Sequence, residues 1–170
     1  MCLIKKTWLL QIFLISCAYF LNCFALNEDS QQPMHIEANS TVIDYKNGKN
    51  IYEGNVKVDQ GTTHVVADRL ITINNDKHKI KEAIAYGLNN LAEFITLPNP
   101  KDKVFTAKSK IIKFYPIDSK VILEGSVSVI QGQNSFRGPI IIYNMKDQIV
   151  NVPASKGGRA MIVIETKKSA

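Results

Sequence analysis

Hydrophobic and polar residues alternate with a period of two in several short runs of this chain after residue 25, which is typical of β-strands that bury one face. The alternation is clearest at Val56/Val58 and at Val127/Val129. After residue 25, no stretch keeps a helical apolar period over three turns. Further strands are predicted at residues 70–73, 111–114, 140–143 and 161–164.

Turn-forming sequences separate these apolar runs at short and similar intervals. Examples are Lys46-Asn47-Gly48-Lys49, Asn74-Asn75-Asp76 and Pro116-Ile117-Asp118-Ser119. Regular strand-and-turn spacing favours a sandwich, a barrel or a jelly roll, so the sequence predicts an all-β protein. No linker is long enough to divide the chain, and 26–170 is predicted to be a single domain.

One strand sequence occurs twice. Residues 51–61 and 122–132 share the pattern Ile-x-Glu-Gly-x-Val-x-Val-x-Gln-Gly. Downstream, Val65 to Leu70 aligns with Phe136 to Ile141 at the same offset. The repeat predicts an all-β scaffold built by duplication.

The repeat also extends upstream, where Ala38-x-Ser40 resembles Ala107-x-Ser109. This alignment requires two additional residues in the second copy before its Glu-Gly. We expect that insertion to lie in a turn, where added length costs little.

The first 25 residues have the order of a secretory signal peptide. Lys5 and Lys6 precede an uncharged and mostly apolar run, and the small residue Ala25 ends it. We therefore expect cleavage after Ala25. An uncleaved N-terminal anchor and lipoprotein processing at Cys17 are the alternatives, although the run is short for a membrane span.

Removal of this segment changes the composition of the chain. All three cysteines, at positions 2, 17 and 23, lie within it, so residues 26–170 can form no disulfide. Lys5 and Lys6 are its only charged residues, so the net charge falls from +6 to +4. A mildly basic protein suits an acidic partner such as a phosphorylated lipid, or is simply more soluble. The basic residues are dispersed, and we expect no nucleic acid partner.

The chain offers few groups for catalysis or metal binding. The histidines, His35, His64 and His78, have no clustered ligands around them in the sequence. Glu53 and Glu124 could suggest a two-carboxylate glycosidase. Because each precedes a Gly at the same place in a repeated strand, they are better explained as structural duplicates. We expect no enzyme activity, no metal and no cofactor.

Four short motifs follow one another in a fixed order: residues 33–38 (PMHIEA), residues 52–61 (YEGNVKVDQG), Ala67-Asp68-x-Leu70 and Ala85-Tyr86-Gly87. With the signal peptide, this series resembles the OstA-like family of periplasmic lipopolysaccharide-transport proteins. The resemblance covers almost all of the chain after the signal. The chain departs from the family pattern at Pro139, where Asp is usual, and in a longer loop after Gly87.

The resemblance implies an antiparallel β-jelly roll, V-shaped in section and open at its ends. Such a protein resides in the periplasm and shields the acyl chains of lipid A while it carries lipopolysaccharide from the inner to the outer membrane. Its implied partners are lipopolysaccharide, an inner-membrane-anchored jelly-roll transport protein, the outer-membrane lipopolysaccharide translocon, and further copies in a head-to-tail homo-oligomer. A membrane-tethered jelly roll of the same pathway and a glycan-binding jelly roll are the alternatives.

The resemblance also implies which residues face the lipid. They are apolar positions on the expected strands, and Phe94 follows the longer loop, where the register is hard to fix. The residues are Met34, Ile36, Ile43, Val56, Val58, Phe94, Ile112, Phe114, Val127, Val129 and Tyr143.

Overall fold

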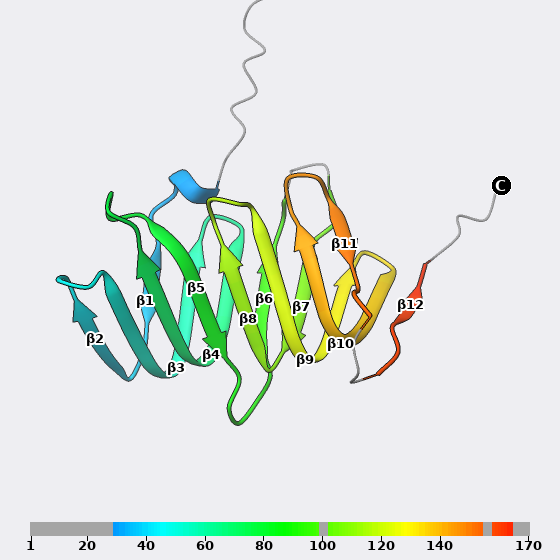
Figure 1. The fold of residues 1–170 in the computed structure, drawn as a ribbon, viewed down its shortest axis with the longest axis horizontal. Coiled ribbons are helices and arrows are strands. Elements are labelled where there is room, and N and C mark those ends of the chain that lie inside the picture. The colour runs from blue at the N-terminus through cyan, green and yellow to red at the C-terminus, as the bar shows by residue number, and fades with distance from the viewer. Residues whose placement is uncertain (1–28, 99–101, 155–157, 165–170) are drawn as a thin grey trace, which may run out of the picture.

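The structure, a computed structural model, describes residues 29–98, 102–154 and 158–164. Within these ranges, twelve antiparallel strands form one continuous sheet (Figure 1). The first six strands are β1 (His35–Glu37), β2 (Ser40–Asp44), β3 (Lys49–Gln60), β4 (Thr63–Asn74), β5 (Ile80–Tyr86) and β6 (Ala92–Thr96). The other six are β7 (Phe105–Ser109), β8 (Ile111–Tyr115), β9 (Lys120–Gln131), β10 (Asn134–Asn144), β11 (Ile149–Asn151) and β12 (Met161–Val163).

Helix is almost absent, as the alternation predicts. The described residues hold a single 3-10 turn, η2 (Asp29–Gln31). Among them, no helix is long and apolar enough to cross a membrane. The predicted signal peptide, 1–25, lies outside the described residues.

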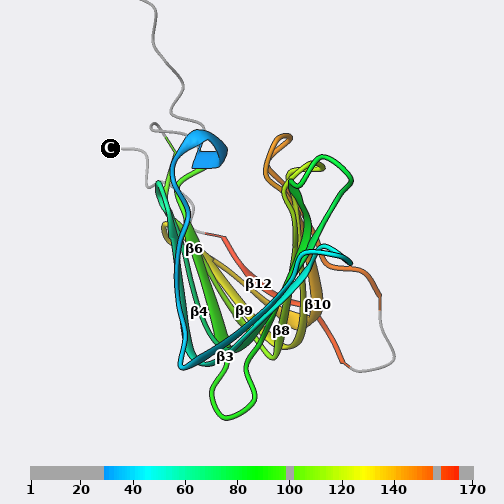
Figure 2. The same cartoon turned by 90° about the vertical axis from the view of Figure 1, so that its left-hand side faces the viewer.

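The sheet folds into a V when it is seen from one end (Figure 2). The long strands β3, β4, β9 and β10 run through both limbs, and the short strands extend one limb or the other. We call the limb that contains β1, β6, β7 and β12 the β6 wall. The limb that contains β2, β5, β8 and β11 is the β8 wall. The all-β fold expected from the alternation and the V shape implied by the family resemblance are both confirmed.

A glycine at the middle of β3 and of β9 allows the strand to bend between the walls. Gly54 and Asn55 have φ values of 78° and 49°, and Gly125 and Ser126 have 77° and 53°. The β3–β4 pairing shifts register between Glu53 and Val56 at this place. Such a bulge kinks a strand and adds twist, and glycine adopts positive φ without a steric penalty. The repeated Glu-Gly therefore marks the crease of the V.

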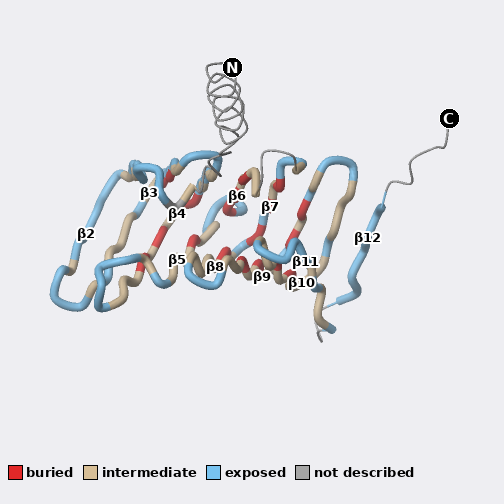
Figure 3. Tube along the Cα trace, turned by 90° about the horizontal axis from the view of Figure 1, so that it is seen from above, coloured by how far each residue is buried: buried red, intermediate tan, exposed pale blue. Residues whose placement is uncertain are grey.

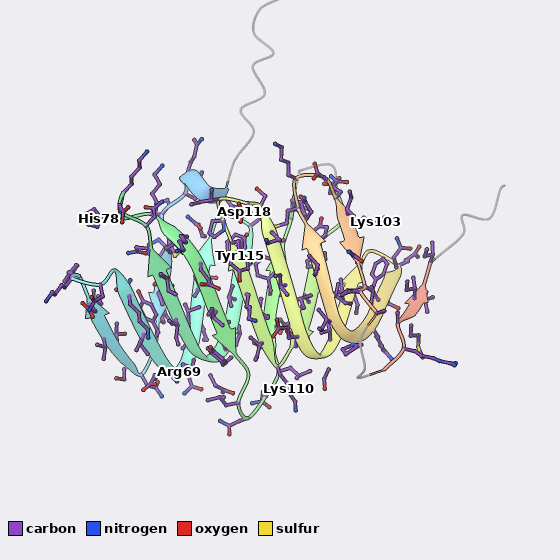
Figure 4. The ribbon with its side chains drawn as sticks, in the orientation of Figure 1. Arg69, His78, Lys103, Lys110, Tyr115 and Asp118 are labelled. Atoms are coloured by element: carbon purple, nitrogen blue, oxygen red, sulfur yellow. The ribbon has the colours of Figure 1, made fainter. Side chains whose placement is uncertain are left out.

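The neighbouring short strands break at the same crease. The backbone N–H of Asn39, between β1 and β2, donates to the Gly54 carbonyl at 2.9 Å. The N–H of Lys110, between β7 and β8, donates to the Gly125 carbonyl at 2.9 Å. These bonds satisfy backbone groups that the bend would leave unpaired. Lys110 and Arg69 accordingly lie at the closed edge of the V (Figure 4).

Strand pairing confirms the duplication over six strands. In the first copy β3 pairs with β1, β2 and β4, and β4 pairs with β5 and β6. In the second copy β9 pairs with β7, β8 and β10, and β10 pairs with β11 and β12. Each strand of one copy thus has a counterpart in the other.

The register corrects the upstream alignment of the repeat. Ile36 faces Val58 as Ala107 faces Val129, and Ser40 faces Glu53 as Ile111 faces Glu124. The counterpart of Ala107 is therefore Ile36, not Ala38, and the expected two-residue insertion is absent. A slip of two residues keeps each side chain on the same face of a strand, so alternation could not reveal the error.

Buried residues are concentrated around β6 to β10, whereas β2 and β12 are exposed (Figure 3). The core lies between the walls and consists of the inward-facing residues of both copies. Among its largest fully buried side chains are Tyr143, Phe94, Phe105, Ile112 and Leu123.

Asp68 anchors the loop that follows β5. Its carboxylate accepts hydrogen bonds from the backbone N–H groups of Leu88 at 2.6 Å and Asn89 at 2.7 Å. The backbone bond from Asn89 is the largest cause that lowers the pKa of Asp68. Gly87 is required beside it, because an added Cβ would lie 2.2 Å from the Asn90 carbonyl oxygen. Two of the motifs noted in the sequence, Ala-Asp-x-Leu and Ala-Tyr-Gly, therefore form one capped loop.

The crease glycines lead to a first prediction. Gly54→Ala and Gly125→Ala should each lower the free energy of unfolding by about 1–3 kcal/mol, because a side chain at positive φ is strained. Urea unfolding followed by circular dichroism measures this. Lys57→Ala, on the exposed face of β3, is the control and should change stability little. Equal stability of all three variants would contradict the assignment of the crease.

The Asp68 cap leads to a second prediction. Asp68→Ala should speed amide hydrogen exchange at Leu88, Asn89 and Asn90 and leave the strands protected. Because the folded-state pKa is lowered, the cap is fully present above the ordinary carboxyl pKa of 3.8. It is lost as the pH falls through the lower folded value. Asp76→Ala, in an exposed turn, is the control. Unchanged exchange in the 88–90 loop would rule out this role.

Candidate functional site

A pocket opens between the two walls in the first copy of the repeat. The space between its lining atoms, open solvent at the mouth included, is about 540 Å³. Its lining is almost entirely apolar. The residues are Met34, Val58, Gln60, Thr63, Val65, Leu70, Thr72, Ile80, Ala83, Ala85, Phe94, Ile112, Phe114 and Pro116.

Both walls contribute because the splay of the V separates facing side chains. Val58 pairs with Val65 across β3 and β4, and Val65 pairs with Phe94 on β6. The β8 wall supplies Phe114, whose ring centroid lies 5.8 Å from that of Phe94 at an interplanar angle of 49°. Two sheets packed at about 10 Å fill the space between them with their own side chains. Wider separation on one side of Phe94 leaves the pocket.

The polar groups of the lining are hydroxyls and an amide that bond to the protein itself. Thr72 is buried and accepts a hydrogen bond from Asn50 Nδ2 at 3.1 Å. Thr63 and Thr96 share a hydroxyl hydrogen bond at 2.9 Å. Beside Thr72, burial raises the pKa of Tyr52. Among the residues that the structure describes, the lining contains no ionisable side chain, which suits an uncharged and apolar occupant.

The N-terminal segment crosses the rim of the β6 wall and ends in the pocket. Asp29 accepts hydrogen bonds from the Thr62 N–H at 2.9 Å and from the Thr63 hydroxyl at 2.7 Å. Gln60 Nε2 donates to the Gln32 carbonyl at 3.0 Å. These bonds hold the segment over the β3–β4 turn. Met34, which follows it, is placed at the mouth of the pocket.

The structure distributes the expected lipid-facing residues over three environments. Five line the pocket, namely Met34, Val58, Phe94, Ile112 and Phe114. Four are in the closed core instead, namely Val56, Val127, Val129 and Tyr143. Ile36 packs, partly buried, against that core.

Ile43 has a different environment from the other ten. It pairs with Asn50, whose side chain bonds to the pocket residue Thr72, so Ile43 is on the inner face. The side chain of Ile43 is nevertheless 48% exposed, because β2 is an edge strand. Ile43 thus lies at the open end of the V and not in the pocket.

Several pocket residues were not anticipated, including Val65, Leu70, Ile80 and Ala83. Val65 and Leu70 lie on β4 and are the cross-strand partners of Val58 and Tyr52. Pairing the two alternating runs through the Gln60–Thr62 turn would have identified Val65. Ile80 and Ala83 belong to β5, whose sequence Ile-Lys-Glu-Ala-Ile-Ala-Tyr shows little alternation.

The groups that could suggest catalysis are engaged elsewhere. Glu53 lies 3.1 Å from Arg69 Nε, and Glu124 lies 2.7 Å from Lys113 Nζ, so each repeated glutamate forms an ion pair. His64 forms a hydrogen bond with Asp59. Within the part of the chain that the structure describes, no three His, Cys, Asp or Glu side chains are grouped as metal ligands.

The pattern of one protein family, described as LptA/(LptD N-terminal domain) LPS transport protein, matches residues 35–149. This chain belongs to that family. The resemblance drawn from the four motifs is therefore confirmed. The matched region extends from the start of β1 to the start of β11, and includes the crease and every listed pocket residue except Met34.

Individual members of the LPS transport family are similar in sequence to this chain over most of its length. The lipopolysaccharide export system protein LptH of Pseudomonas aeruginosa is 31% identical over 153 residues, which cover 86% of each chain. The lipopolysaccharide export system protein LptA of Escherichia coli K12 is 27% identical over 141 residues, covering 83% of this chain and 75% of that one.

A solved structure confirms the fold. The crystal structure of P. aeruginosa LptH superposes with a TM-score of 0.73 at 28% sequence identity. The match covers 81% of this chain and 99% of the LptH chain. That protein is described as the LptA homologous periplasmic component of the conserved lipopolysaccharide transport device.

Proposed function

We propose that this protein is a periplasmic carrier of lipopolysaccharide that shelters lipid A acyl chains between its two walls. The observation that carries the proposal is the apolar pocket, whose described lining residues include no ionisable side chain. Membership of the LPS transport family supports the choice of cargo. The protein acts without catalysis and needs no cofactor.

The energetics of the cargo favour such a pocket. Exposing an acyl chain of about a dozen carbons to water costs on the order of 10 kcal/mol, at about 0.8 kcal/mol for each methylene. A path lined by polar groups would not offset that cost. The sugar and phosphate groups remain outside, beside the charged rims on which Lys103, Asp118 and His78 lie (Figure 4).

A glycan-binding jelly roll is the rival function. Sugar sites gather side-chain hydrogen-bond donors and acceptors around the ligand. Here, the polar side chains among the described lining residues are Gln60, Thr63 and Thr72, and each is bonded to the protein itself. The chemistry of the lining therefore favours hydrocarbon over carbohydrate.

Both ends of the sheet support assembly into a head-to-tail bridge. Among the described strands, β1 and β2 at one end pair only with β3, and β11 and β12 at the other end pair only with β10. Edge strands of this kind can accept a strand from another molecule. The ends also expose apolar side chains, namely Val42, Ile43, Ile149, Met161, Ile162 and Val163.

The junction between the two internal copies shows how such ends would fit. Within the chain, β5 pairs with β8 and β6 pairs with β7. Between two molecules, the equivalent pairs are β11 of one molecule with β2 of the next, and β12 of one molecule with β1 of the next. Ile84 faces Lys113 inside the chain, so Asn151 of one molecule should face Val42 of the next. Such a contact does not close on itself and makes filaments.

The same edges would receive the partners at the two membranes. The matched family includes the N-terminal domain of LptD as well as LptA. A jelly roll anchored in the inner membrane would pair with one end of the filament. The matching domain of the outer-membrane translocon would pair with the other end.

A pair of adjacent valines tests the lipid site. Val65 lines the pocket, whereas Val66 is 49% exposed on the other face of β4. Val65→Asp should weaken lipopolysaccharide binding about tenfold or more, because a carboxylate against hydrocarbon costs well over the 1.4 kcal/mol that corresponds to tenfold. Val66→Asp should bind normally. Fluorescence titration with purified lipopolysaccharide, at equal folded concentration, measures both.

A third variant separates loss of binding from loss of folding. Val65→Trp keeps the site apolar but occupies its space, and it should also reduce binding. Equal binding by all three variants and the unmodified protein would refute a lipid site at this pocket.

Paired cysteines test the proposed register between molecules. Val42→Cys with Asn151→Cys should give a ladder of disulfide-linked oligomers on mild oxidation. Val66→Cys with Asn151→Cys places one thiol away from the ends and should not. The single variants control for cysteines 2, 17 and 23. Equal ladders from both pairs, or none from the first, would exclude this register.

A further inference from the structure

The interior is open in the first copy of the repeat and closed in the second. The pocket residues all precede Ile117, and beyond them the core residues Val121, Leu123, Val129 and Ile141 retain no exposed surface. The two halves share one strand arrangement, so backbone topology does not explain the difference. The explanation lies in the side chains at equivalent positions.

Two positions differ in a way that accounts for the closure. Tyr143 faces Val121 as Thr72 faces Asn50, so Tyr143 is the counterpart of Thr72. Phe105 faces Gln131 and is the counterpart of Met34, which precedes β1 beside Gln60. Met34 and Thr72 both line the pocket.

Phe105 and Tyr143 close the space that Met34 and Thr72 leave open. Their rings stack across the V with centroids 4.3 Å apart and an interplanar angle of 9°. Phe105 belongs to the β6 wall and Tyr143 to the β8 wall, and both are fully buried. Phe94 connects this stack to the pocket, with its centroid 6.3 Å from that of Phe105.

A hydrogen bond at the mouth of the V joins the same two walls. Gln148, in the turn between β10 and β11, donates from Nε2 to Asp102 Oδ2 at 2.7 Å. Asp102 lies in the connection between β6 and β7. This contact and the stack below it hold the walls together on one side of the pocket.

The closed arrangement leaves one polar group unsatisfied. The Tyr143 hydroxyl is buried and makes no hydrogen bond among the described residues. Burial, together with the negative charge of Asp102, raises the pKa of Tyr143. Leaving a buried hydroxyl unpaired destabilises the closed state relative to an open one.

We propose that Phe105 and Tyr143 form the boundary of the lipid site, and that an acyl chain moving toward β12 has to separate this pair. The proposal rests on the function proposed above. In this proposal the acyl chain rests in the pocket, and the Phe105–Tyr143 pair limits how far the chain extends along the V. Separation of the two walls is then a different step from capture of the lipid.

The test compares lipid contact on the two sides of the pair. A photoreactive benzoylphenylalanine replaces Phe114, in the pocket, or Phe136, the counterpart of the pocket residue Val65 in the second copy. Both positions are aromatic, so the replacement is conservative. After irradiation with purified lipopolysaccharide, the Phe136 to Phe114 crosslinking ratio reports passage. In the otherwise unmodified protein this ratio should be low.

Two changes should move the ratio in opposite directions. Phe105→Met with Tyr143→Thr installs the residues of the open copy and should raise the ratio several-fold. Asp102→Cys with Gln148→Cys, joined by a short cleavable thiol reagent, should abolish the Phe136 signal and preserve the Phe114 signal. Cleavage of the reagent should restore the Phe136 signal. The single cysteine variants, treated alike, control for the other thiols.

Two milder variants test the boundary in case the Phe105→Met, Tyr143→Thr double mutant is too unstable to fold. Tyr143→Phe keeps the stack and removes the unpaired hydroxyl, so the ratio should stay low. Gln148→Ala loosens the mouth without changing the core, so the ratio should rise. A high ratio in the unmodified protein that the thiol link does not change would overturn the boundary and leave capture intact. No crosslinking at Phe114 in any variant would instead refute the proposed function.

Discussion

The bend that carries each long strand from one wall to the other is the constraint on which the rest of the structure depends. A sheet that continued straight would have no interior, and two separate sheets would pack their side chains together. Gly54 and Gly125, with the positive φ of the residues that follow them, let one sheet supply both walls. The backbone bonds from Asn39 and Lys110 keep the bend paired. The pocket, the open ends and the contacts across the mouth all follow from this geometry.

Duplication made the scaffold, and divergence of inward-facing residues made its two halves different. Val56 and Val58 have counterparts in Val127 and Val129 that are also valines, so the floor of the V is the same in both copies. The upper positions differ in size, and there one half is hollow and the other filled. A single set of strand pairings thus supports a site on one side and a closed core on the other.

The strands with strict alternation could be predicted from the sequence because one of their faces is buried in the core. β5 was not predicted because Lys81 and Glu82 interrupt its alternation, and β1 and β2 are too short and exposed to be predicted from alternation alone. Side-chain parity identified inward-facing residues correctly but could not say whether an inward residue meets a pocket or a packed core. Val127 and Val58 look alike in sequence, and only the facing wall distinguishes them.

The loop held by Asp68 distinguishes the outer surface of the first copy of the repeat. It protrudes at the crease of the first copy and carries Leu88, which is 69% exposed. In the second copy Pro139 occupies the position equivalent to Asp68 and has no carboxylate to hold such a loop. An array of these molecules would therefore present the Asp68-held loop once for every two copies of the repeat, always on the same half. A factor that contacted only the outside of the array could tell one end from the other.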